Sequence, residues 1–517
     1  MLRSFPEVVR SGPGAADGVE LCGITLDSRA VQPGDLYAAL PGARTHGAAF
    51  VAQAIAAGAA AVLTDPDGAR LIAADTADAA SAVFAEAGTA VPVLTTADPR
   101  GCLGAISAWV YGDPTATLRL LGVTGTNGKT TVAYLLDAGL RGAGETTGLV
   151  GTVETRIAGR AVPSVRTTPE APDLQGLFAR MVGSGVGSAA MEVSSHALAL
   201  HRVDGCRFAG AAFTNLSQDH LDFHADMEDY FAAKAMLFDP ARSAMAVVDV
   251  DDAYGRRLLE MRPDAIPVSS LGHPGIPAAW WAEDVATAPT SSRFTLCAPD
   301  GGRLPVDVPL PGAFNVANTI VALVLLAATG VDLDAAIAGI AALPGVPGRM
   351  EKVDAGQPYL ALVDYAHTPA AVTTLLDTVR SVISGRVIVV LGCGGDRDRV
   401  KRPLMGAAAA RGADVAVVTS DNPRSEDPQA ILDAMVSGVA EVPDAERAAV
   451  QVELDRAAAI RLAVAAARAG DAVVVAGKGH ETGQTMNDVV TPFDDRIELR
   501  DALLAALGTP FRPAGTS

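Results

Sequence analysis

Short apolar runs alternate with longer stretches of helical pattern along most of this chain. The runs after residue 100 fall into two groups, at residues 119–123, 187–193, 208–214 and 244–250, and at 359–365, 386–392, 414–420 and 471–477. Buried strands that alternate with helices are typical of parallel sheets covered by helices. The pattern therefore predicts an α/β protein.

The same pattern divides the chain into three predicted domains. Residues 1–99 mix short apolar runs with turn signals such as PGD at Pro33, which indicates a small α/β domain. Proline and glycine cluster at residues 343–348. A chain of 517 residues is too long for one core. We expect domains at 1–99, 100–345 and 346–517, the central one built on a mainly parallel sheet.

Composition narrows the functional classes. Hydrophobic residues make up 49% of the chain and aromatic residues only 4%, a balance common in proteins of GC-rich bacteria. The net charge of −19 argues against a nucleic-acid-binding protein, which needs a clustered basic surface. An anionic substrate would have to meet a local positive field from a few basic side chains and helix N-termini.

Cysteine spacing and hydropathy indicate a cytoplasmic protein. The five cysteines are scattered, without a CxxC pair or metal-ligand spacing, so we expect reduced thiols. The N-terminal residues MLRSFPEVVR lack the apolar core of a secretory signal. The uncharged stretch at residues 308–331 carries prolines and asparagines in its first half, which predicts a loop leading into a buried helix and no membrane insertion.

A phosphate-binding loop is predicted between the strand at 119–123 and the helix after it. Its residues are Gly125, Thr126, Asn127, Gly128, Lys129, Thr130 and Thr131. Backbone N–H groups and the helix N-terminus cradle phosphate in this context. We expect Lys129 to reach the β and γ phosphates of ATP and Thr130 to hold Mg²⁺. A glycine turn that only starts a helix is the alternative.

Two further residues strengthen the phosphate and metal hypothesis. Glu192, in MEVSSH, ends a predicted strand, where a phosphate-loop fold commonly holds its metal. His220, in NLSQDHLD, follows the next strand, at the carboxyl edge where open α/β sheets bind ligands. Either residue alone would more often be structural, but together they indicate a metal and phosphate site.

At this point the motifs closely resemble those of the Mur ligases, the ATP-dependent amino-acid ligases of peptidoglycan synthesis. They are LDSR, GTNGKTT, RTTPE, MEVSSH, NLSQDHLDFH, YFAAKAMLF, PGAFNVAN, GRME, DYAHTP, GCGGDRDRVKRPLM, DNPR and GKGHE. Their order most resembles the family member that adds the third amino acid.

The resemblance implies an N-terminal domain for the UDP end of the substrate, a central ATPase domain and a C-terminal Rossmann-like domain. It also implies that ATP phosphorylates a D-glutamate carboxylate, because an amine cannot displace oxide from a carboxylate directly. The acceptor amine then attacks the acyl phosphate, and protein groups position reactants and neutralise charge. We expect a monomer.

The resemblance also assigns the catalytic residues. It implies that Lys234 is carbamylated by CO₂ to N6-carboxylysine and helps Glu192 and His220 to hold a second Mg²⁺. An ordinary surface lysine is the alternative. Asn315 and Arg349 are expected to contact ATP, and Asp364 and His367 to join them from the C-terminal domain.

For the substrates, the resemblance implies UDP-MurNAc-L-Ala-D-Glu and meso-2,6-diaminopimelate. Contacts to the UDP substrate are expected from Leu26, Ser28, Arg44, Thr45, His46, Thr167, Thr168, Ser194 and Arg202. Contacts to diaminopimelate are expected from Arg397, Asp421, Asn422, Pro423, Arg424, Gly477 and Glu481. An arginine fork matches both oxygens of the distal carboxylate, so Arg424 favours diaminopimelate over lysine.

Three alternatives stay open. A lysine-adding member of the family is disfavoured by Arg424. A folylpolyglutamate synthetase is disfavoured by the N-terminal segment with LDSR, which those enzymes lack. An NTP-binding regulatory protein that has lost its chemistry is disfavoured by the retained set of Lys129, Glu192, His220, Lys234 and His367.

Overall fold

A computed structural model of the chain describes residues 4–10, 18–42, 44–78, 91–163, 166–272 and 278–508, and the side chains of 75–78 are not described. Contact density divides the chain into two compact units. The first comprises Met1–Gly122, Glu145–Ala211 and Ala233–Met245, and the second Val123–Gly144, Ala212–Ala232 and Ala246–Ser517. Within the described ranges, none of the helices combines the length and apolar character that a membrane span requires.

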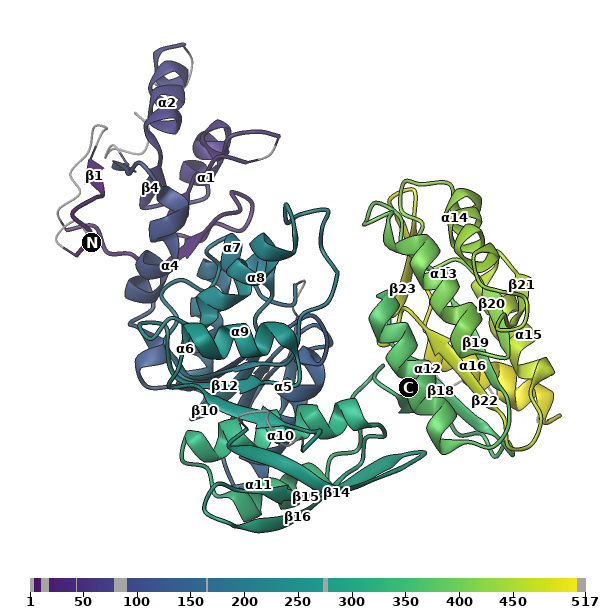
Figure 1. The fold of residues 1–517 in the computed structure, drawn as a ribbon. Helices are drawn as coiled ribbons and strands as arrows, with labels where there is room; N and C mark the ends of the chain where they lie inside the picture. The colour runs from purple at the N-terminus through teal and green to yellow at the C-terminus, as the bar shows by residue number, and fades with distance from the viewer. Residues whose placement is uncertain are drawn as a thin grey trace. The chain divides into compact units, whose positions relative to one another are not determined.

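The described residues of the N-terminal segment form a sheet of five strands in the order β1-β5-β4-β3-β2 (Figure 1). The strands are β1 (Val9–Arg10), β2 (Gly23–Thr25), β3 (Asp35–Ala38), β4 (Ala61–Thr64) and β5 (Val93–Thr95). The helices are η1 (Gly47–Phe50), α1 (Val51–Ala56), α2 (Pro66–Asp78), α4 (Pro99–Val110) and η2 (Pro114–Ala116). β2 to β5 pair in parallel, whereas β1 is antiparallel to β5.

Side chains alternate between two cores on the faces of this sheet, as the period of a strand requires. Leu36 and Leu63 enter one core, and Tyr37 and Val62 enter the other. The first core includes buried residues of α4, so the domain boundary expected at 99/100 falls at the N-terminus of a helix that packs on the N-terminal sheet.

The central sheet has eleven strands in the order β16-β15-β14-β13-β12-β11-β6-β10-β7-β8-β9. They are β6 (Arg119–Thr124), β7 (Thr147–Val150), β8 (Thr155–Ile157), β9 (Arg160–Val162), β10 (Ser188–Glu192), β11 (Phe208–Phe213), β12 (Ser243–Asp249), β13 (Ile266–Ser269), β14 (Trp280–Ala288), β15 (Ser291–Cys297) and β16 (Arg303–Val308). Parallel pairs such as β7 with β10 and β12 with β13 give way to antiparallel strands at both edges.

Helices connect the central strands. They are α5 (Lys129–Gly142), α6 (Ala171–Gly183), α7 (Ser195–Ala199), α8 (Met227–Ala235), η3 (Met236–Phe238), α9 (Ala253–Met261), α10 (Ala313–Ala328) and α11 (Leu333–Ala341). α10 is the buried helix expected inside residues 308–331, and its mostly apolar surface packs against α5. The sequence therefore assigned this apolar stretch correctly to the interior.

The C-terminal sheet follows the order β17-β18-β22-β19-β20-β21. Its strands are β17 (Glu351–Lys352), β18 (Leu360–Asp364), β19 (Val387–Leu391), β20 (Val415–Val418), β21 (Ala449–Val452) and β22 (Ala472–Ala476). All pair in parallel except β17. A separate hairpin pairs β23 (Gly483–Met486) with β24 (Val489–Pro492).

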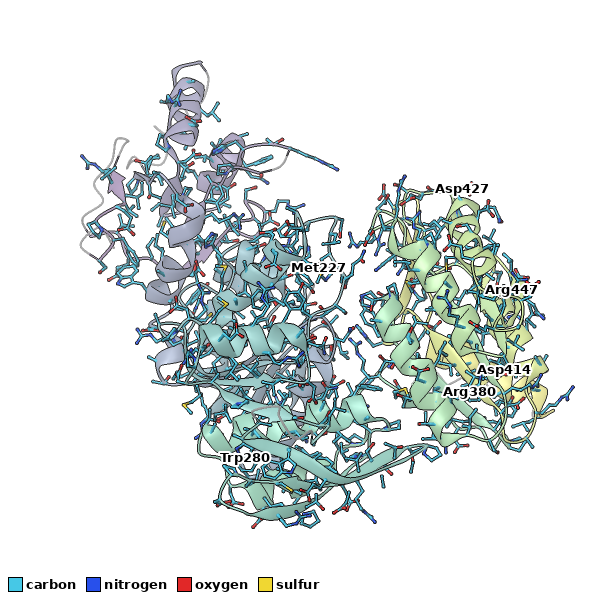
Figure 2. All side chains as sticks on the ribbon, in the orientation of Figure 1. Met227, Trp280, Arg380, Asp414, Asp427 and Arg447 are labelled. Atoms are coloured by element: carbon cyan, nitrogen blue, oxygen red, sulfur yellow. The ribbon has the colours of Figure 1, made fainter. Side chains whose placement is uncertain are left out.

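Two groups of helices cover the faces of the C-terminal sheet. One face carries α12 (Pro369–Val382), α13 (Lys401–Gly412) and α14 (Pro428–Ala440), and the other α15 (Arg456–Ala466) and α16 (Asp495–Ala506). Asp427, labelled in Figure 2, begins α14 by accepting a hydrogen bond from the N–H of Gln429 at 3.0 Å. Figure 2 also labels Arg380 and Asp414, an exposed ion pair at 2.7 Å.

Candidate functional site

The loop from Gly125 to Thr131 joins the end of β6 to the start of α5 and needs glycine at two positions. Gly128 has φ +89° and stands at the N-cap of α5. A Cβ at Gly128 would collide with Oδ1 of Asn318, and one at Gly125 with Oγ1 of Thr214. Both glycines therefore let the loop pack closely against α10 and against the residue that follows β11. A tight glycine turn that leads into a helix N-terminus is the arrangement that suits phosphate.

Residues after β11 hold this loop. Thr214 donates its hydroxyl to the carbonyl of Asn127 at 2.6 Å, and the side-chain oxygen of Asn215 accepts the N–H of Asn127 at 3.0 Å. The hydroxyls of Thr126 and Tyr230 are 3.1 Å apart. The sequence assigned no role to Thr214, Asn215 or Tyr230, although Asn215 begins the NLSQDHLDFH motif and Thr214 directly precedes it. The position of Thr214 and Asn215 directly after a predicted strand is the feature of the sequence that could have indicated a role for them.

Lys129 and Thr130 lie on the same turn with defined partners. The ammonium of Lys129 donates to the carbonyls of Gly125 at 2.9 Å and Thr126 at 2.8 Å. Arg349 donates to the hydroxyl of Thr130 at 3.0 Å, and its guanidinium lies 4.4 Å from the ring centre of Tyr365. Two positive side chains thus stand at the loop, which gives an otherwise acidic chain the local field that a phosphate needs.

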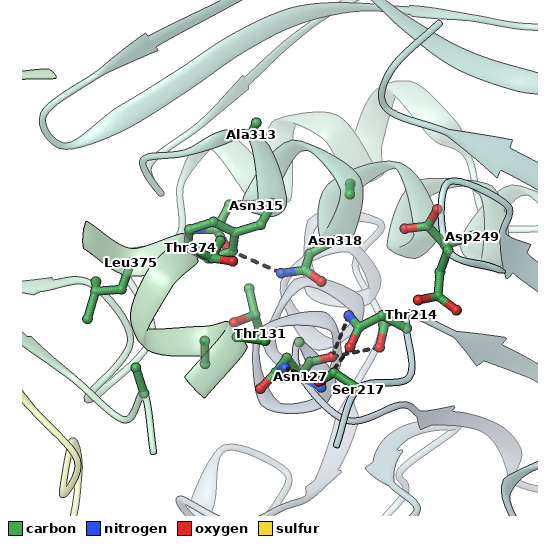
Figure 3. A pocket seen from close by; sticks show the side chains of 18 of the residues that line it. Asn127, Thr131, Thr214, Ser217, Asp249, Ala313, Asn315, Asn318, Thr374 and Leu375 are labelled. Carbon is green, nitrogen blue, oxygen red and sulfur yellow. Dashed lines mark hydrogen bonds between the residues drawn. The ribbon is translucent and has the colours of Figure 1, made fainter. Parts of the chain in front are cut away.

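A cavity of about 470 Å³ opens beside the loop (Figure 3). Thr131, Asn315, Asn318 and Asp249 line it, together with Asp364. Asn315 is buried, donates to the carbonyl of Pro311 at 2.7 Å and accepts from Asn318 at 3.2 Å. The volume falls in the range of ligand pockets. Of the predicted ATP residues outside the loop, Asn315, Arg349 and Asp364 thus share one cavity with the phosphate loop.

Two buried carboxyl groups of this cavity have raised pKa values. Burial, and then the neighbouring charge of Asp251, raise the pKa of Asp249 to about 8. Burial also raises the pKa of Asp364, against the opposing charge of Arg349. The carboxylate of Asp364 accepts the N–H groups of Met350 and Ala366, each at 2.7 Å. Asp364 therefore holds the backbone on either side of it in place.

His220 and His367 share one acidic neighbour. Asp219 lies 3.5 Å from Nε2 of His220, 3.6 Å from Nε2 of His367 and 3.7 Å from the ammonium of Lys401. Burial alone would raise the pKa of Asp219, but its contacts with His367, His220 and Lys401 lower it. His220 has φ +56°, a strained backbone of the kind found at functional sites. The sequence did not single out Asp219.

Glu192 ends β10 as expected, in the first compact unit. Thr152 donates its N–H to Glu192 Oε1 at 2.7 Å and its hydroxyl to Oε2 at 3.1 Å. Thr168 donates to the carbonyl of Glu192 at 2.9 Å. Lys234, near the end of α8, is only 1% exposed. This burial contradicts the alternative in which Lys234 is an ordinary surface lysine.

The residues expected at the UDP substrate also lie in the first unit. Ser28 donates to Gln53 at 3.0 Å, Arg44 and Thr45 are exposed, and His46 pairs with Asp65 at 3.1 Å.

The other residues expected at the UDP substrate also have polar partners. Thr167 contacts Thr152 at 2.9 Å, Ser194 accepts the N–H of Ala197 at 3.1 Å, and Arg202 pairs with Glu170 at 2.9 Å. Leu26 packs at the edge of the N-terminal core.

The residues expected to bind diaminopimelate gather at one edge of the C-terminal sheet. Asn422 donates to Glu481 Oε2 at 2.8 Å. Arg424 has φ +52° and donates to the carbonyl of Gly395 at 2.5 Å. The hairpin of β23 and β24 holds the backbone of Arg424, whose N–H donates to the carbonyl of Thr485 at 2.9 Å. Arg397 is exposed on the loop after β19. Asp421 is buried, and Pro423 and Gly477 lie on the same loops.

The side-chain oxygens present suit Mg²⁺ that is bound by protein and substrate together. Among the described residues, no cluster of three or more histidine, cysteine, aspartate or glutamate side chains could form a metal cage. Magnesium usually binds one or two protein oxygens plus phosphates and water. The hydroxyl of Thr130 is an oxygen of that type within the second unit, and the carboxylate of Glu192 is one within the first unit.

The fold and this loop define the class: a multidomain α/β protein with a phosphate-binding loop between strand and helix. Residues 20–106 match the family description "Mur ligase family, catalytic domain", residues 123–326 "Mur ligase middle domain" and residues 348–479 "Mur ligase, glutamate ligase domain". The chain belongs to the Mur ligase family. The expected α/β class with three domains is thereby confirmed.

Relatives of known name cover nearly the whole chain. The UDP-N-acetylmuramoyl-L-alanyl-D-glutamate--2,6-diaminopimelate ligase of Streptomyces avermitilis is 58% identical over 95% of this chain and 94% of its own length. The ligase of the same name from Corynebacterium glutamicum is 48% identical, over 96% of this chain and 95% of its own length. A solved structure of a ligase of that name is 34% identical, with a TM-score of 0.64 over 94% of this chain and 95% of its own.

More distant structures share the fold alone. The MurF ligase of Thermotoga maritima, solved in complex with ADP, is 16% identical, with a TM-score of 0.59 over 95% of this chain and 98% of its own.

Proposed function

We propose that the chain is an ATP-dependent ligase that adds meso-2,6-diaminopimelate to the D-glutamate of UDP-N-acetylmuramoyl-L-alanyl-D-glutamate. The observation that carries this proposal is the cluster of Asn422, Arg424 and Glu481 at one edge of the C-terminal sheet. Its support is the name shared by relatives up to 58% identical over nearly their full length.

The proposed domains divide the work. Residues 1–99 bind the UDP end, residues 100–345 bind ATP, and residues 346–517 bind the amino acid. Within the second unit, the loop from Gly125 to Thr131, its cavity and Arg349 form the ATP site. Lys129 offsets the charge of the β and γ phosphates, and Asn315 and Asp364 shape the cavity beside them.

The reaction needs activation before amide formation. The γ-carboxylate of D-glutamate attacks the γ-phosphorus of ATP, the bond to the bridging oxygen breaks, and ADP leaves. The amine of diaminopimelate then attacks the acyl phosphate carbon, loses a proton, and phosphate leaves with its bonding electrons. Protein groups contribute positioning and charge neutralisation.

Magnesium, when bound, neutralises phosphate charge at the reacting oxygens. Thr130, Glu192 and His220 are the proposed ligands, with a carbamate on Lys234. The burial of Lys234 supports a role inside the protein over that of a surface lysine. His367 lies 3.6 Å from Asp219, the neighbour of His220, so the two histidines share one acidic neighbour within the second unit.

Acceptor selection follows from charge. The distal carboxylate is what distinguishes diaminopimelate from lysine, and the Arg424 fork is the group suited to bind it. Glu481 is suited to the distal ammonium. The lysine-adding alternative lacks a role for Arg424.

The test is ADP release with the UDP-dipeptide and either diaminopimelate or lysine as acceptor. We expect release that requires both the UDP-dipeptide and diaminopimelate, with lysine supporting less than a tenth of that rate. Equal rates with lysine would favour the lysine-adding alternative. ADP release that needs no acceptor, or none at all, would contradict the ligase.

A further inference from the structure

Lys478 is a buried cation to which the sequence assigned no role. It stands between Gly477 and Glu481, after β22, and its side chain is 0% exposed. Its ammonium donates to Oε2 of Glu481 at 2.9 Å and to Oδ1 of Asn422 at 3.1 Å, and Oδ1 of Asp421 lies 3.8 Å away. One ammonium therefore contacts three side chains of the proposed acceptor site.

These contacts determine how Asn422 is oriented. Its Oδ1 accepts from Lys478 and from the N–H of Thr485 at 2.9 Å, so its amide nitrogen must face the other way. That nitrogen donates to Oε2 of Glu481 at 2.8 Å. A reversed amide would place its nitrogen against two donors, which is unfavourable in a buried site.

The same contacts assign the two oxygens of Glu481 to different tasks. Lys478 and Asn422 both bind Oε2. Oε1 is the oxygen that these two bonds leave for an incoming cation. A carboxylate held on one oxygen has its other oxygen in a fixed direction, so it can select an ammonium by position as well as by charge.

A purely structural lysine would be a poor choice at this place. Burying an ammonium is costly unless partners surround it, and apolar residues of similar size commonly stabilise a core as well or better. All three partners of Lys478 belong to the loops expected to bind the amino acid. We propose that Lys478 is a positioning residue that orients Asn422 and Glu481 for the acceptor; this inference rests on the proposed function.

The test compares Lys478→Met and Lys478→Gln with the wild-type full chain, by steady-state ADP release at varied concentrations of each substrate. We expect Lys478→Met to raise the KM for diaminopimelate at least about tenfold, while the KM values for ATP and the UDP-dipeptide change less than about twofold. Lys478→Gln retains a donor for Glu481 or Asn422 and should lie between Lys478→Met and wild type.

Lys352→Met is the matched control. Lys352 is also a lysine paired with an acidic side chain, Asp354 at 2.6 Å, but it is 43% exposed. Its removal should leave all three KM values unchanged. The role of Lys478 in positioning the acceptor site would be supported if Lys478→Met raises the KM for diaminopimelate selectively and Lys352→Met does not.

The remaining outcomes each decide between hypotheses. Equal rises in all three KM values, or an unchanged KM for diaminopimelate, would overturn the role of Lys478 and leave the proposed function standing. If ADP release by the wild-type protein does not depend on diaminopimelate, the proposed function itself is wrong. If calorimetry shows that only Lys478→Met fails to fold, Lys478→Gln decides; if neither variant folds, Lys478 is a stability residue and the inference is wrong.

Discussion

The buried pair of Arg456 and Asp495 offers a sharp stability test. Both side chains are 0% exposed, and Arg456 donates to the two carboxylate oxygens of Asp495 at 2.7 Å each. Arg456 also donates to the carbonyls of Ser420 at 3.2 Å and Ala476 at 2.9 Å, the residues just before Asp421 and Gly477. The pair therefore joins α15 and α16 to two loops of the proposed acceptor site.

Arg456→Met keeps much of the side-chain volume and removes the charge. It leaves the carboxylate of Asp495 buried without its partner, a change that costs about 3–5 kcal/mol. For a domain of about 150–250 residues, each kcal/mol lowers the midpoint of thermal unfolding by about 2–4 °C. We therefore expect the transition of the C-terminal segment to fall by about 6–20 °C in calorimetry.

Two control variants distinguish the effect of leaving the Asp495 carboxylate buried and unpaired from a non-specific loss of stability. Arg380→Met removes an Arg–Asp pair of the same 2.7 Å length, but its side chains are 43% and 38% exposed, so we expect a loss of about 1 kcal/mol or less. Arg456→Met combined with Asp495→Leu removes both charges and should recover at least half of the loss. A loss below about 1 kcal/mol for Arg456→Met, or no recovery in the double variant, would refute the reasoning.

Three further predictions concern the sites. Arg424→Ala should raise the KM for diaminopimelate about 30-fold, the equivalent of about 2 kcal/mol for a charged hydrogen bond, and leave the KM for ATP unchanged; equal effects would count against the assignment. Lys234→Ala should lose most ADP release, and added bicarbonate should fail to restore it, whereas unchanged turnover would exclude a carbamate. The raised pKa of Asp249, about 8, predicts that wild-type stability falls as pH rises from about 4 through 8, because the ionised form is disfavoured only in the folded state. Asp249→Asn can still accept the N–H of Asp251 and should flatten this decline, measured as unfolding free energy at pH 5.5 and 8.5; identical slopes would contradict it.

Local sequence patterns were sufficient to predict the strand and the helix start on either side of the glycine loop. The predicted strand at 119–123 is β6, and the glycine turn expected after it does lead into helix α5, because both features depend on neighbouring residues. The antiparallel strands at the edges of the central sheet were not predicted, because their pairing depends on partners far along the chain. The hairpin of β23 and β24, which holds Arg424, was missed for the same reason.

Side-chain environments were harder to predict than positions. Lys234 lies on a helix with an acidic first turn, a pattern that favours an exposed lysine, yet it is buried. Lys478 stands in a motif quoted for its neighbours Gly477 and Glu481, and only the fold brings Asn422 to it from 56 residues away. The burial of a charged side chain depends on which distant segments of the chain cover it. The spacing of apolar residues near that side chain therefore could not predict its burial.

The rule that ligands bind at the carboxyl ends of parallel strands nevertheless explains why so many expected residues lie together. β22, β19 and β20 are adjacent and parallel in the C-terminal sheet, so the loops after them share one edge. Those loops carry Glu481, Arg397 and Asp421 in turn. Strand order thus brings three motifs that are distant in sequence together at the proposed acceptor site. Contacts such as that of Lys478 with Asn422 then give the site its orientation, which strand order alone does not specify.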